Sequence, residues 1–513
     1  MLSALAGLAG CRNEHDEPGP RLVVLYATCT LNKEFLSPYD PEIPYTPNLE
    51  RFAREGIVFQ RHVTEDGQSG VAFASLYSAT QADRHGVYYH PRPLPETLEL
   101  VTEAFAEQGY EPFFWSGQSM ASAELGYAQG VPSENVFQHH VMFSKHPRKL
   151  GQAFFDEVTA NGPELEGVLE RLRADPGRRA FLSINFTITH ELYHQYADLE
   201  EIEAFRREFP SRATDLSREE IARTLELFEE QRFGLQFDFP NTARELGLGP
   251  QDVERIDRVL RLAYAACVHQ LDRYFGEFLA KIERAGLGKE SLVLFTADHG
   301  ENFYRDHELF HWTHGGQIAR SELEVPCIVR GRGAGLASGA YEGVTRSIDV
   351  FPTLLGLCGL AAPAGLEGVD LAPALRGESP PPELLAFSHT STLGEERIER
   401  FRREGLELLL SYLPEPDPEW MWVGLRDGDL AFKLRPSEPG VFHTVAYDLA
   451  ADPAERCDVF DASNPLHAER AAELVRYKER LVRAYSGSSS LSQEEVLKRL
   501  EGLGYVGEEG EGQ

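Results

Sequence analysis

The stretch LVLFTADHGEN, residues 292–302, decides the predicted fold. It opens with an unbroken run of apolar and β-branched residues, which is typical of a strand buried on both faces of a parallel sheet. The run ends on Asp298 and His299, two side chains of the kinds that bind metal ions. Ligands of open parallel sheets bind beyond the carboxyl ends of the strands. The stretch therefore predicts an α/β fold and the edge of the sheet at which a site would lie.

Two other predicted strands also end on chemically active side chains. Residues 21–28, RLVVLYAT, are followed by Cys29, and residues 180–190, AFLSINFTITH, end on His190. Helical segments alternate with these strands, which implies right-handed βαβ units and a mostly parallel sheet. The carboxyl ends of such strands meet at one edge. We therefore expect the three strand ends to converge on one crevice, although about 270 residues separate the first from the last.

The chain is long enough for two domains, because one hydrophobic core rarely grows beyond about 250–300 residues. A Pro-rich joint at residues 376–385 separates the alternating strands and helices from shorter strand-like pieces and a helix. The predicted division is a signal and tether at 1–20, an α/β domain at 21–376 with a charged helical insertion at 191–250, a small antiparallel-sheet subdomain at 384–486 and a tail at 487–513.

The formal net charge of -32 restricts the partners. Nucleic acids are bound by clustered Lys and Arg, so we expect no nucleic-acid partner. The hydrophobic fraction of 42% is that of a soluble globular chain, and no apolar run approaches the length of a membrane span. The six cysteines lack any paired spacing, which argues against a disulfide framework. Nothing in the sequence indicates an oligomeric state.

The N-terminal run MLSALAGLAGC, residues 1–11, resembles a bacterial lipobox, in which the cysteine is lipidated. The polar, Pro-containing residues after Cys11 would suit a tether. The basic start of a signal peptide is missing, so a chance run of small residues is the alternative. The prediction is a protein of the bacterial cell envelope, lipid-anchored in the periplasm or outer membrane, or a secreted one. Membrane contact is expected only through that anchor.

A set of segments in a fixed order resembles the sulfatase family of the alkaline phosphatase superfamily. The segments are YTPNLERFAREGIVF (45–59), SLYSATQADRHGV (75–87), the stretch from AYAACVHQ to TADHGEN (263–302), LEVPCIVRGRG (323–333), RSIDVFPTLLGLCGL and its continuation to LRG (346–377), and AYDLAADPAERCDV (446–459). The resemblance covers about residues 21–506. It implies a large α/β domain, a smaller C-terminal four-stranded domain, and hydrolysis of a sulfate or phosphate ester.

The resemblance also implies one divalent metal ion. Asp298 and His299 match the late pair of family ligands, but Cys29 and Thr30 stand where the family has one or two aspartates. By resemblance the ion would be Ca²⁺ or Mg²⁺. Ligation by a Cys29 thiolate would instead favour Zn²⁺, because calcium and magnesium prefer oxygen ligands. The alternative is that Cys29 is a small buried side chain and the metal site is lost.

The family nucleophile is a Cys or Ser in the motif Cys/Ser-x-Pro-x-Arg, and it becomes formylglycine. Here Ser69 stands in that position, with Val71 and Phe73 in place of the proline and arginine. We therefore expect no conversion of Ser69 to formylglycine. A plain serine hydroxyl is still a nucleophile when it is activated. The alternative is that Ser69 only caps a helix beginning at Val71.

Two histidines match family positions. His190 matches the histidine of the family's Pro-His-x-Pro-Tyr motif, although both prolines are missing, and His314 matches the Lys or His that contacts the ester and its leaving group. A histidine there could donate a proton to the leaving alkoxide. Gly117 and Ser119 replace the family's Lys-x-His pair, which depletes the site of positive charge. His85 matches a family motif and is interpreted as structural. His307 and His311 flank His314 and could supplement it.

Three functions remain open from these residues. The preferred one is a sulfatase-like hydrolase of sulfate esters at a metal site, with turnover impaired by the altered residues. The second is a metal-dependent phosphatase or phosphodiesterase that uses Ser69 directly. The third is a catalytically inactive member of the family that binds a ligand. In the first two cases the substrate would be a small-molecule or saccharide ester, and its identity is not encoded in any recognisable motif.

Overall fold

A computed structural model describes residues 19–139, 150–210, 215–304, 310–332, 335–391 and 417–486, together with Glu495, Lys498 and Arg499. The lipobox-like run with Cys11, His307 and most of the predicted tail lie outside the described residues. Among the described helices, none is both long enough and apolar enough to cross a bilayer.

The centre of the molecule is an eight-stranded sheet with the order β4-β3-β5-β1-β6-β7-β2-β8. Neighbouring strands are parallel, except that β7 runs against β6 and β2. The strands are β1 (Leu22–Thr28), β2 (Ile57–Val63), β3 (Glu111–Ser116), β4 (Val136–Gln138), β5 (Ala180–Phe186), β6 (Ser291–Ala297), β7 (Cys327–Gly331) and β8 (Gly339–Arg346). Every residue of β1, β5 and β6 is buried, as their continuous apolar runs require.

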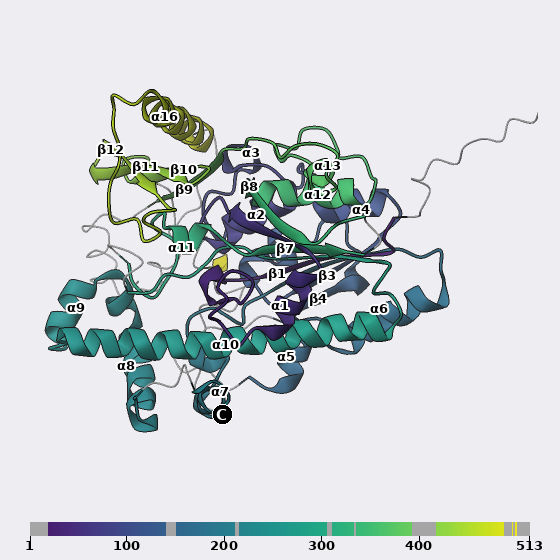
Figure 1. The fold of residues 1–513 in the computed structure, drawn as a ribbon, viewed down its shortest axis with the longest axis horizontal. Helices are drawn as coiled ribbons and strands as arrows, with labels where there is room; N and C mark the ends of the chain where they lie inside the picture. The colour runs from purple at the N-terminus through teal and green to yellow at the C-terminus, as the bar shows by residue number, and fades with distance from the viewer. Residues whose placement is uncertain are drawn as a thin grey trace, which may run out of the picture.

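Helices cover both faces of this sheet, which places it in the middle of three layers (Figure 1). One face carries α1 (Pro47–Arg54), α5 (Gln152–Val158), α6 (Pro163–Ala174) and α10 (Pro250–Arg284). The other carries α2 (Ser69–Ser78), α4 (Val101–Glu107), α12 (Val350–Leu357) and α13 (Ala372–Leu375). Short helices α3 (Ala82–His85) and α11 (Arg320–Leu323) lie in connections.

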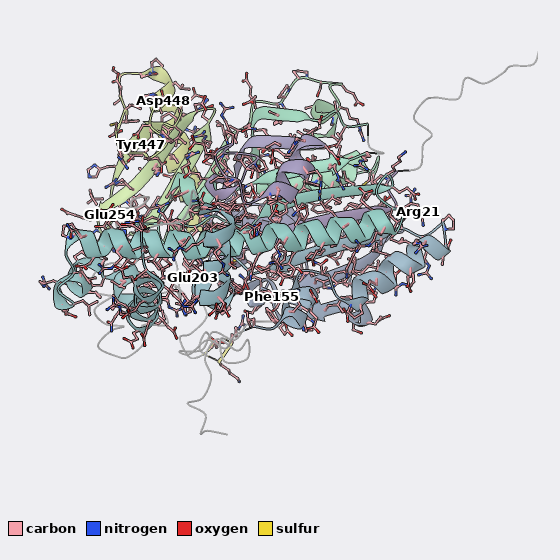
Figure 2. The ribbon with its side chains drawn as sticks, turned by 60° about the horizontal axis from the view of Figure 1, so that its bottom comes forward. Arg21, Phe155, Glu203, Glu254, Tyr447 and Asp448 are labelled. Carbon is pink, nitrogen blue, oxygen red and sulfur yellow. The ribbon has the colours of Figure 1, made fainter. Side chains whose placement is uncertain are left out.

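The predicted insertion is helical, with α7 (Leu199–Glu208), α8 (Arg218–Phe237) and α9 (Phe239–Glu245). α7 and α8 pack beside α10, and α9 packs against α8. The 35 residues of α10 make it about 52 Å long. Figure 2 shows α10 running along most of the molecule, with Glu254 near its start. The length of α10 lets one helix support both the sheet and the insertion.

A second, antiparallel sheet follows in the C-terminal part, with the order β12-β11-β10-β9. Its elements are β9 (Ala386–Ser391), β10 (Met421–Asp427), β11 (Leu430–Glu438), β12 (Val441–Asp448) and the helix α16 (Pro465–Ser486). Tyr447 and Asp448 mark its edge strand β12 in Figure 2. The predicted α/β fold class with a smaller C-terminal α+β part is confirmed, whereas the exact domain boundaries stay predictions.

A buried polar network joins the two sheets at Glu65. Its carboxylate accepts hydrogen bonds from Tyr477 on α16 at 2.7 Å, from Ser75 on α2 at 2.5 Å and from the Ala82 backbone at 3.0 Å. Burial alone would raise the pKa of Glu65, but His85, His389 and the hydrogen bond from Ser75 lower it to about 2. Glu65 therefore stays ionised although it is buried.

Tyr477→Phe is expected to lower the free energy of unfolding by about 1–3 kcal/mol, because the buried Glu65 carboxylate loses a donor. Tyr341→Phe is the matched control, since the Tyr341 hydroxyl is buried and has no hydrogen-bond partner among the described residues. Urea unfolding of both variants checks this. Equal stability of Tyr477→Phe and the parent protein would show that this bond does not hold the two parts together.

Candidate active site and metal centre

Three distant segments meet beyond the carboxyl ends of β1 and β6, as expected from the sequence. Cys29 follows β1, Asp298 and His299 follow β6, and Ser69 begins α2. The Ser69 Oγ lies 3.3 Å from the Cys29 Sγ and 3.1 Å from the His299 Nε2. All four residues are buried. Cys29, Asp298 and His299, called the Cys29 cluster below, offer one ligand atom each within 4.8 Å of one another.

Backbone hydrogen bonds fix the geometry of the Cys29 cluster. Asp298 Oδ1 accepts hydrogen bonds from the backbone N–H groups of Thr30 at 3.0 Å and His299 at 2.7 Å. Thr30 adopts a positive φ of 60°, which turns the chain sharply after β1 and brings its N–H toward β6. Asp298 Oδ2 is buried and has no hydrogen-bond partner among the described residues. One carboxylate oxygen is thus used for structure and the other faces the cluster.

His299 is oriented by its own loop. Its Nδ1 lies 2.9 Å from the Gly300 carbonyl oxygen, which can only accept, so Nδ1 carries the proton. The lone pair of Nε2 therefore faces Ser69 and Cys29, whose Sγ is 4.0 Å away. This arrangement, with a carbonyl holding one ring nitrogen and the other left to accept, is the usual one for metal-binding histidines.

Ser69 is the first residue of α2, and Gln68 is the N-cap residue. The alternative in which Ser69 caps a helix starting at Val71 is therefore wrong: the helix begins two residues earlier. Gln118 adds a contact that the sequence did not predict, because its Nε2 donates to both Ser69 Oγ and Cys29 Sγ at 3.1 Å. Gln118 lies between Gly117 and Ser119, the two positions singled out by alignment.

The Cys29 cluster fits a borderline divalent cation. Across a tetrahedral zinc ion, sulfur and nitrogen ligands stand about 3.6 Å apart and nitrogen and oxygen ligands about 3.3 Å apart. The Cys29 Sγ and His299 Nε2 are 4.0 Å apart, and the His299 Nε2 and Asp298 Oδ2 are 3.5 Å apart. The buried Asp298 Oδ2, which lacks a partner among the described residues, is the oxygen that a cation would use. Three protein ligands would leave a fourth position open, as in catalytic zinc sites.

Without a cation, burial favours the neutral forms of the Cys29 thiol and the His299 imidazole. Burial and the charge of Asp298 raise the pKa of the Cys29 thiol well above its usual value, despite hydrogen bonds from Ser69 and Thr30. Burial lowers the pKa of His299, and the nearby Asp298 carboxylate opposes this only in part. A neutral imidazole is the form that binds metal, whereas the thiol would have to release its proton.

His190 and His314 lie side by side at the same edge, next to the Cys29 cluster. Their ring centres are 4.8 Å apart, and those of His299 and His314 are 4.3 Å apart. Burial alone would lower the pKa of His190, but the adjacent Glu191 carboxylate outweighs it and raises that pKa. Burial and the neighbouring histidines His299, His190 and His90 lower the pKa of His314 well below its usual value. All six predicted site residues are therefore brought together, while their roles stay predictions.

Two buried glutamates at this place were missed from the sequence. Glu191 Oε2 lies 2.8 Å from the His190 Nδ1 and 3.7 Å from the His314 Nδ1, and Glu301 Oε1 lies 3.5 Å from that same His314 nitrogen. We call His190, Glu191, Glu301 and His314 the Glu191 cluster. Glu191 directly follows His190, and Glu301 lies two residues after His299. A glutamate so close to a histidine at a strand end is the sequence signal that could have indicated both. His311 instead packs against the Phe239 ring and belongs to neither cluster.

The comparison with known families settles the ancestry of this site. The sulfatase family model matches residues 22–360, which is more than half of the chain. The chain belongs to the sulfatase family. The expectation drawn from the order of the segments is confirmed.

This sulfatase-family chain is similar to proteins of more than one named activity. It is 24% identical over 401 residues to the multifunctional alkaline phosphatase superfamily protein PehA of Trinickia caryophylli, covering 65% of this chain and 72% of that protein. It is 22% identical over 569 aligned positions to an N-acetylglucosamine-6-O-sulfatase of Bacteroides thetaiotaomicron, covering 97% and 92%. A protein solved in complex with its substrate D-glucosamine-2-N,6-O-disulfate has the same fold, with a TM-score of 0.62, 16% identity and coverage of 92% and 99%.

The side chains that follow Ser69 in this sulfatase-family protein form a hydrophobic wall. Val71 and Phe73 are fully buried, and the Phe73 ring packs 5.7 Å from that of Tyr77. A Cβ on Gly117 would approach Phe186 and Val158 to 3.1 Å, so a longer side chain does not fit there without movement. Val71, Phe73 and Gly117 carry no charge, so none of them brings positive charge to the site.

Proposed function

We propose that this protein hydrolyses a sulfate ester of a saccharide or another small molecule at the Cys29 cluster, with the unmodified Ser69 hydroxyl as nucleophile. The observation that carries the proposal is the position of Ser69 Oγ, 3.1 Å from the His299 Nε2 and 3.3 Å from the Cys29 Sγ. Membership of the sulfatase family supports the class of reaction.

The residues divide the chemistry between them. A divalent cation held by Cys29, Asp298 and His299 would screen the charge of the ester and lower the pKa of a bound hydroxyl. Ser69 Oγ attacks the sulfur atom, an Oγ–S bond forms, and the S–O bond to the leaving oxygen breaks. The proton lost by Ser69 is balanced by the one gained by the leaving alcohol. The Gln118 amide holds Ser69 Oγ in place with a hydrogen bond of 3.1 Å.

The Glu191 cluster would supply positive charge on the side of the leaving oxygen. His190 is the histidine with the raised pKa, so it is the one expected to carry a proton near neutral pH. Water then cleaves the serine ester and regenerates the hydroxyl. A serine sulfate is itself an alkyl sulfate, the same kind of ester as many substrates. Its hydrolysis by water is therefore expected to be slow. Turnover would be impaired at this second step.

The second candidate, a phosphatase or phosphodiesterase using Ser69, is favoured by the unmodified serine and by the sulfur and nitrogen ligands. A phosphoserine intermediate leaves the phosphorus open to attack by water at a metal site, so both steps of turnover can use the same residues. The similarity to a multifunctional member of the superfamily supports this candidate as well. The third candidate, an inactive binding protein, is favoured by the loss of the motif arginine at Phe73.

Single-turnover and steady-state kinetics on p-nitrophenyl sulfate, p-nitrophenyl phosphate and phenyl p-nitrophenyl phosphate separate these candidates. The proposal expects a burst of one p-nitrophenol per protein chain from the sulfate, followed by slow turnover. Rapid turnover of a phosphate ester without a sulfate burst would favour the second candidate. No product from any ester, in the presence of Zn²⁺, Ca²⁺ or Mg²⁺, would leave only the binding protein.

A further inference from the structure

Two buried polar atoms near Ser69, one in each cluster, lack a hydrogen-bond partner among the described residues. Asp298 Oδ2 faces the Cys29 cluster, and His314 Nδ1 lies in the Glu191 cluster, 3.7 Å from the Glu191 Oε2, which pairs with the His190 Nδ1 at 2.8 Å. A buried polar atom without a partner is destabilising. One cation in the Cys29 cluster would satisfy the first atom and leave the second unsatisfied.

The distances around His314 in the Glu191 cluster are too long for hydrogen bonds and suit ligands that share an ion. The His314 Nδ1 lies 3.7 Å from the Glu191 Oε2 and 3.5 Å from the Glu301 Oε1. Hydrogen bonds between nitrogen and oxygen are about 2.7–3.2 Å long, whereas imidazole and carboxylate ligands of one metal ion stand about 3.3 Å apart. His190 completes the set, since one ring nitrogen of it lies within 4.8 Å of the Glu191 and His314 ligand atoms.

Hydrogen bonds from residues outside the Glu191 cluster fix the position of Glu301. The Glu301 Oε2 accepts a hydrogen bond from the Tyr193 hydroxyl at 2.8 Å, and the Glu301 Oε1 accepts one from the Asn302 N–H at 3.1 Å. Glu191 is only 6% exposed and Glu301 is fully buried. Both groups could be ionised in one buried place only if a cation between them offset their mutual repulsion. Outer contacts that orient ligands in this way are typical of metal sites.

We propose that the Glu191 cluster binds a second divalent cation, next to the one expected in the Cys29 cluster. His190, Glu191 and His314 are its ligands, and Glu301 stands beside His314 as a fourth. The ion takes the place of the proton on the His190–Glu191 pair, so when it is bound the ion, and not a protonated His190, carries the positive charge. Carboxylate and imidazole ligands without sulfur suit Zn²⁺ or Mn²⁺. The second ion supplies positive charge at a site where, by the resemblance, Phe73, Gly117 and Ser119 stand in place of basic residues of the family. The inference deepens the proposed function but stands on metal binding alone.

Metal content tests the inference on the full chain. The protein is stripped with a chelator, dialysed against a fixed free concentration of Zn²⁺ and measured by mass spectrometry. The parent protein is expected to hold two equivalents, Glu191→Gln one and Asp298→Asn one. His194→Asn is the matched control, because His194 pairs with Glu229 at 2.9 Å outside both clusters, and it is expected to keep two equivalents.

One equivalent in the parent protein, or two in Glu191→Gln, would overturn the inference. If Glu191→Gln does not fold, as shown by circular dichroism, Glu301→Gln replaces it with the same expectation. Ester hydrolysis with a single bound equivalent would support the proposed function and contradict the second metal site. Two bound equivalents without hydrolysis of any ester would support the second metal site and contradict the proposed function. The two failures are therefore distinguishable.

Discussion

Ser69→Ala is expected to reduce kcat for ester hydrolysis by about 1,000-fold or more, because the nucleophile of the proposed reaction is lost. The folded structure should survive, since the change removes one oxygen from the first residue of α2 and leaves its backbone unchanged. The burst of p-nitrophenol from the sulfate should also vanish. Both quantities are measured by stopped-flow absorbance on the same preparation.

Ser78→Ala is the matched control for this prediction. Ser78 is equally buried on the same helix, but its hydroxyl donates to the Ala74 carbonyl and lies outside the site. Its kinetics should equal those of the parent protein. If Ser69→Ala retained the activity of the parent, another group would be the nucleophile, and Ser69 would only begin the helix α2.

Asp298→Asn is expected to weaken metal binding in the Cys29 cluster by at least about 100-fold, because a neutral amide replaces the buried charged ligand. Cys29→Ser should weaken Zn²⁺ binding but retain Mg²⁺ or Ca²⁺ better, since it exchanges sulfur for oxygen. Isothermal titration with each ion gives both affinities. Hydrolysis should be lost from Asp298→Asn together with the metal.

Asp66→Asn provides the comparison for the loss of a buried carboxyl group. Burial, together with the charge of Glu322, raises the pKa of Asp66 well above its usual value, so the group is expected to be protonated and the amide is a close substitute. Asp66 belongs to neither cluster. Its substitution should change neither metal affinity nor activity. Equal metal affinity of Asp298→Asn and Asp66→Asn would exclude Asp298 as a ligand.

The strands that carry the site could be predicted because they are buried on both faces. β1, β5 and β6 form continuous apolar runs that no surface strand would have, and their parallel direction followed from alternation with helices. The boundaries of helices were less predictable. The segment ETLELVTEAFAEQG, residues 96–109, has helical periodicity throughout, yet α4 covers only Val101–Glu107, because the first residues of the segment lie in the loop before the helix.

The side chains at strand ends could also be predicted, whereas those brought in by loops could not. Cys29, His190 and Asp298 each follow a strand, so their convergence is a property of the sheet. Gln118 reaches Ser69 only because the loop after β3 folds back over α2, which no local pattern encodes. Glu191 lies in the connection after β5 and Glu301 in the connection after β6, so the two come together only in the folded chain. A single sequence carries no signal for such a pair.

The negative charge of the protein makes bound cations central to the proposed hydrolysis. An anionic ester approaches a chain of net charge -32 unfavourably unless its site is locally positive. Phe73 and Gly117 bring no positive charge to the site, and the Glu191 cluster adds two buried glutamates. Bound divalent ions would reverse the local sign, and without them the site would repel an anionic ester.

Anomalous diffraction from crystals grown with Zn²⁺, collected above and below the zinc absorption edge, tests the account most directly. We expect a peak bounded by the Cys29 Sγ, the Asp298 Oδ2 and the His299 Nε2, at about 2.0–2.3 Å from each. Ser69 Oγ should face the open position of that ion. A map with no anomalous density among these three atoms, at saturating zinc, would contradict the metal centre and the hydrolysis built on it.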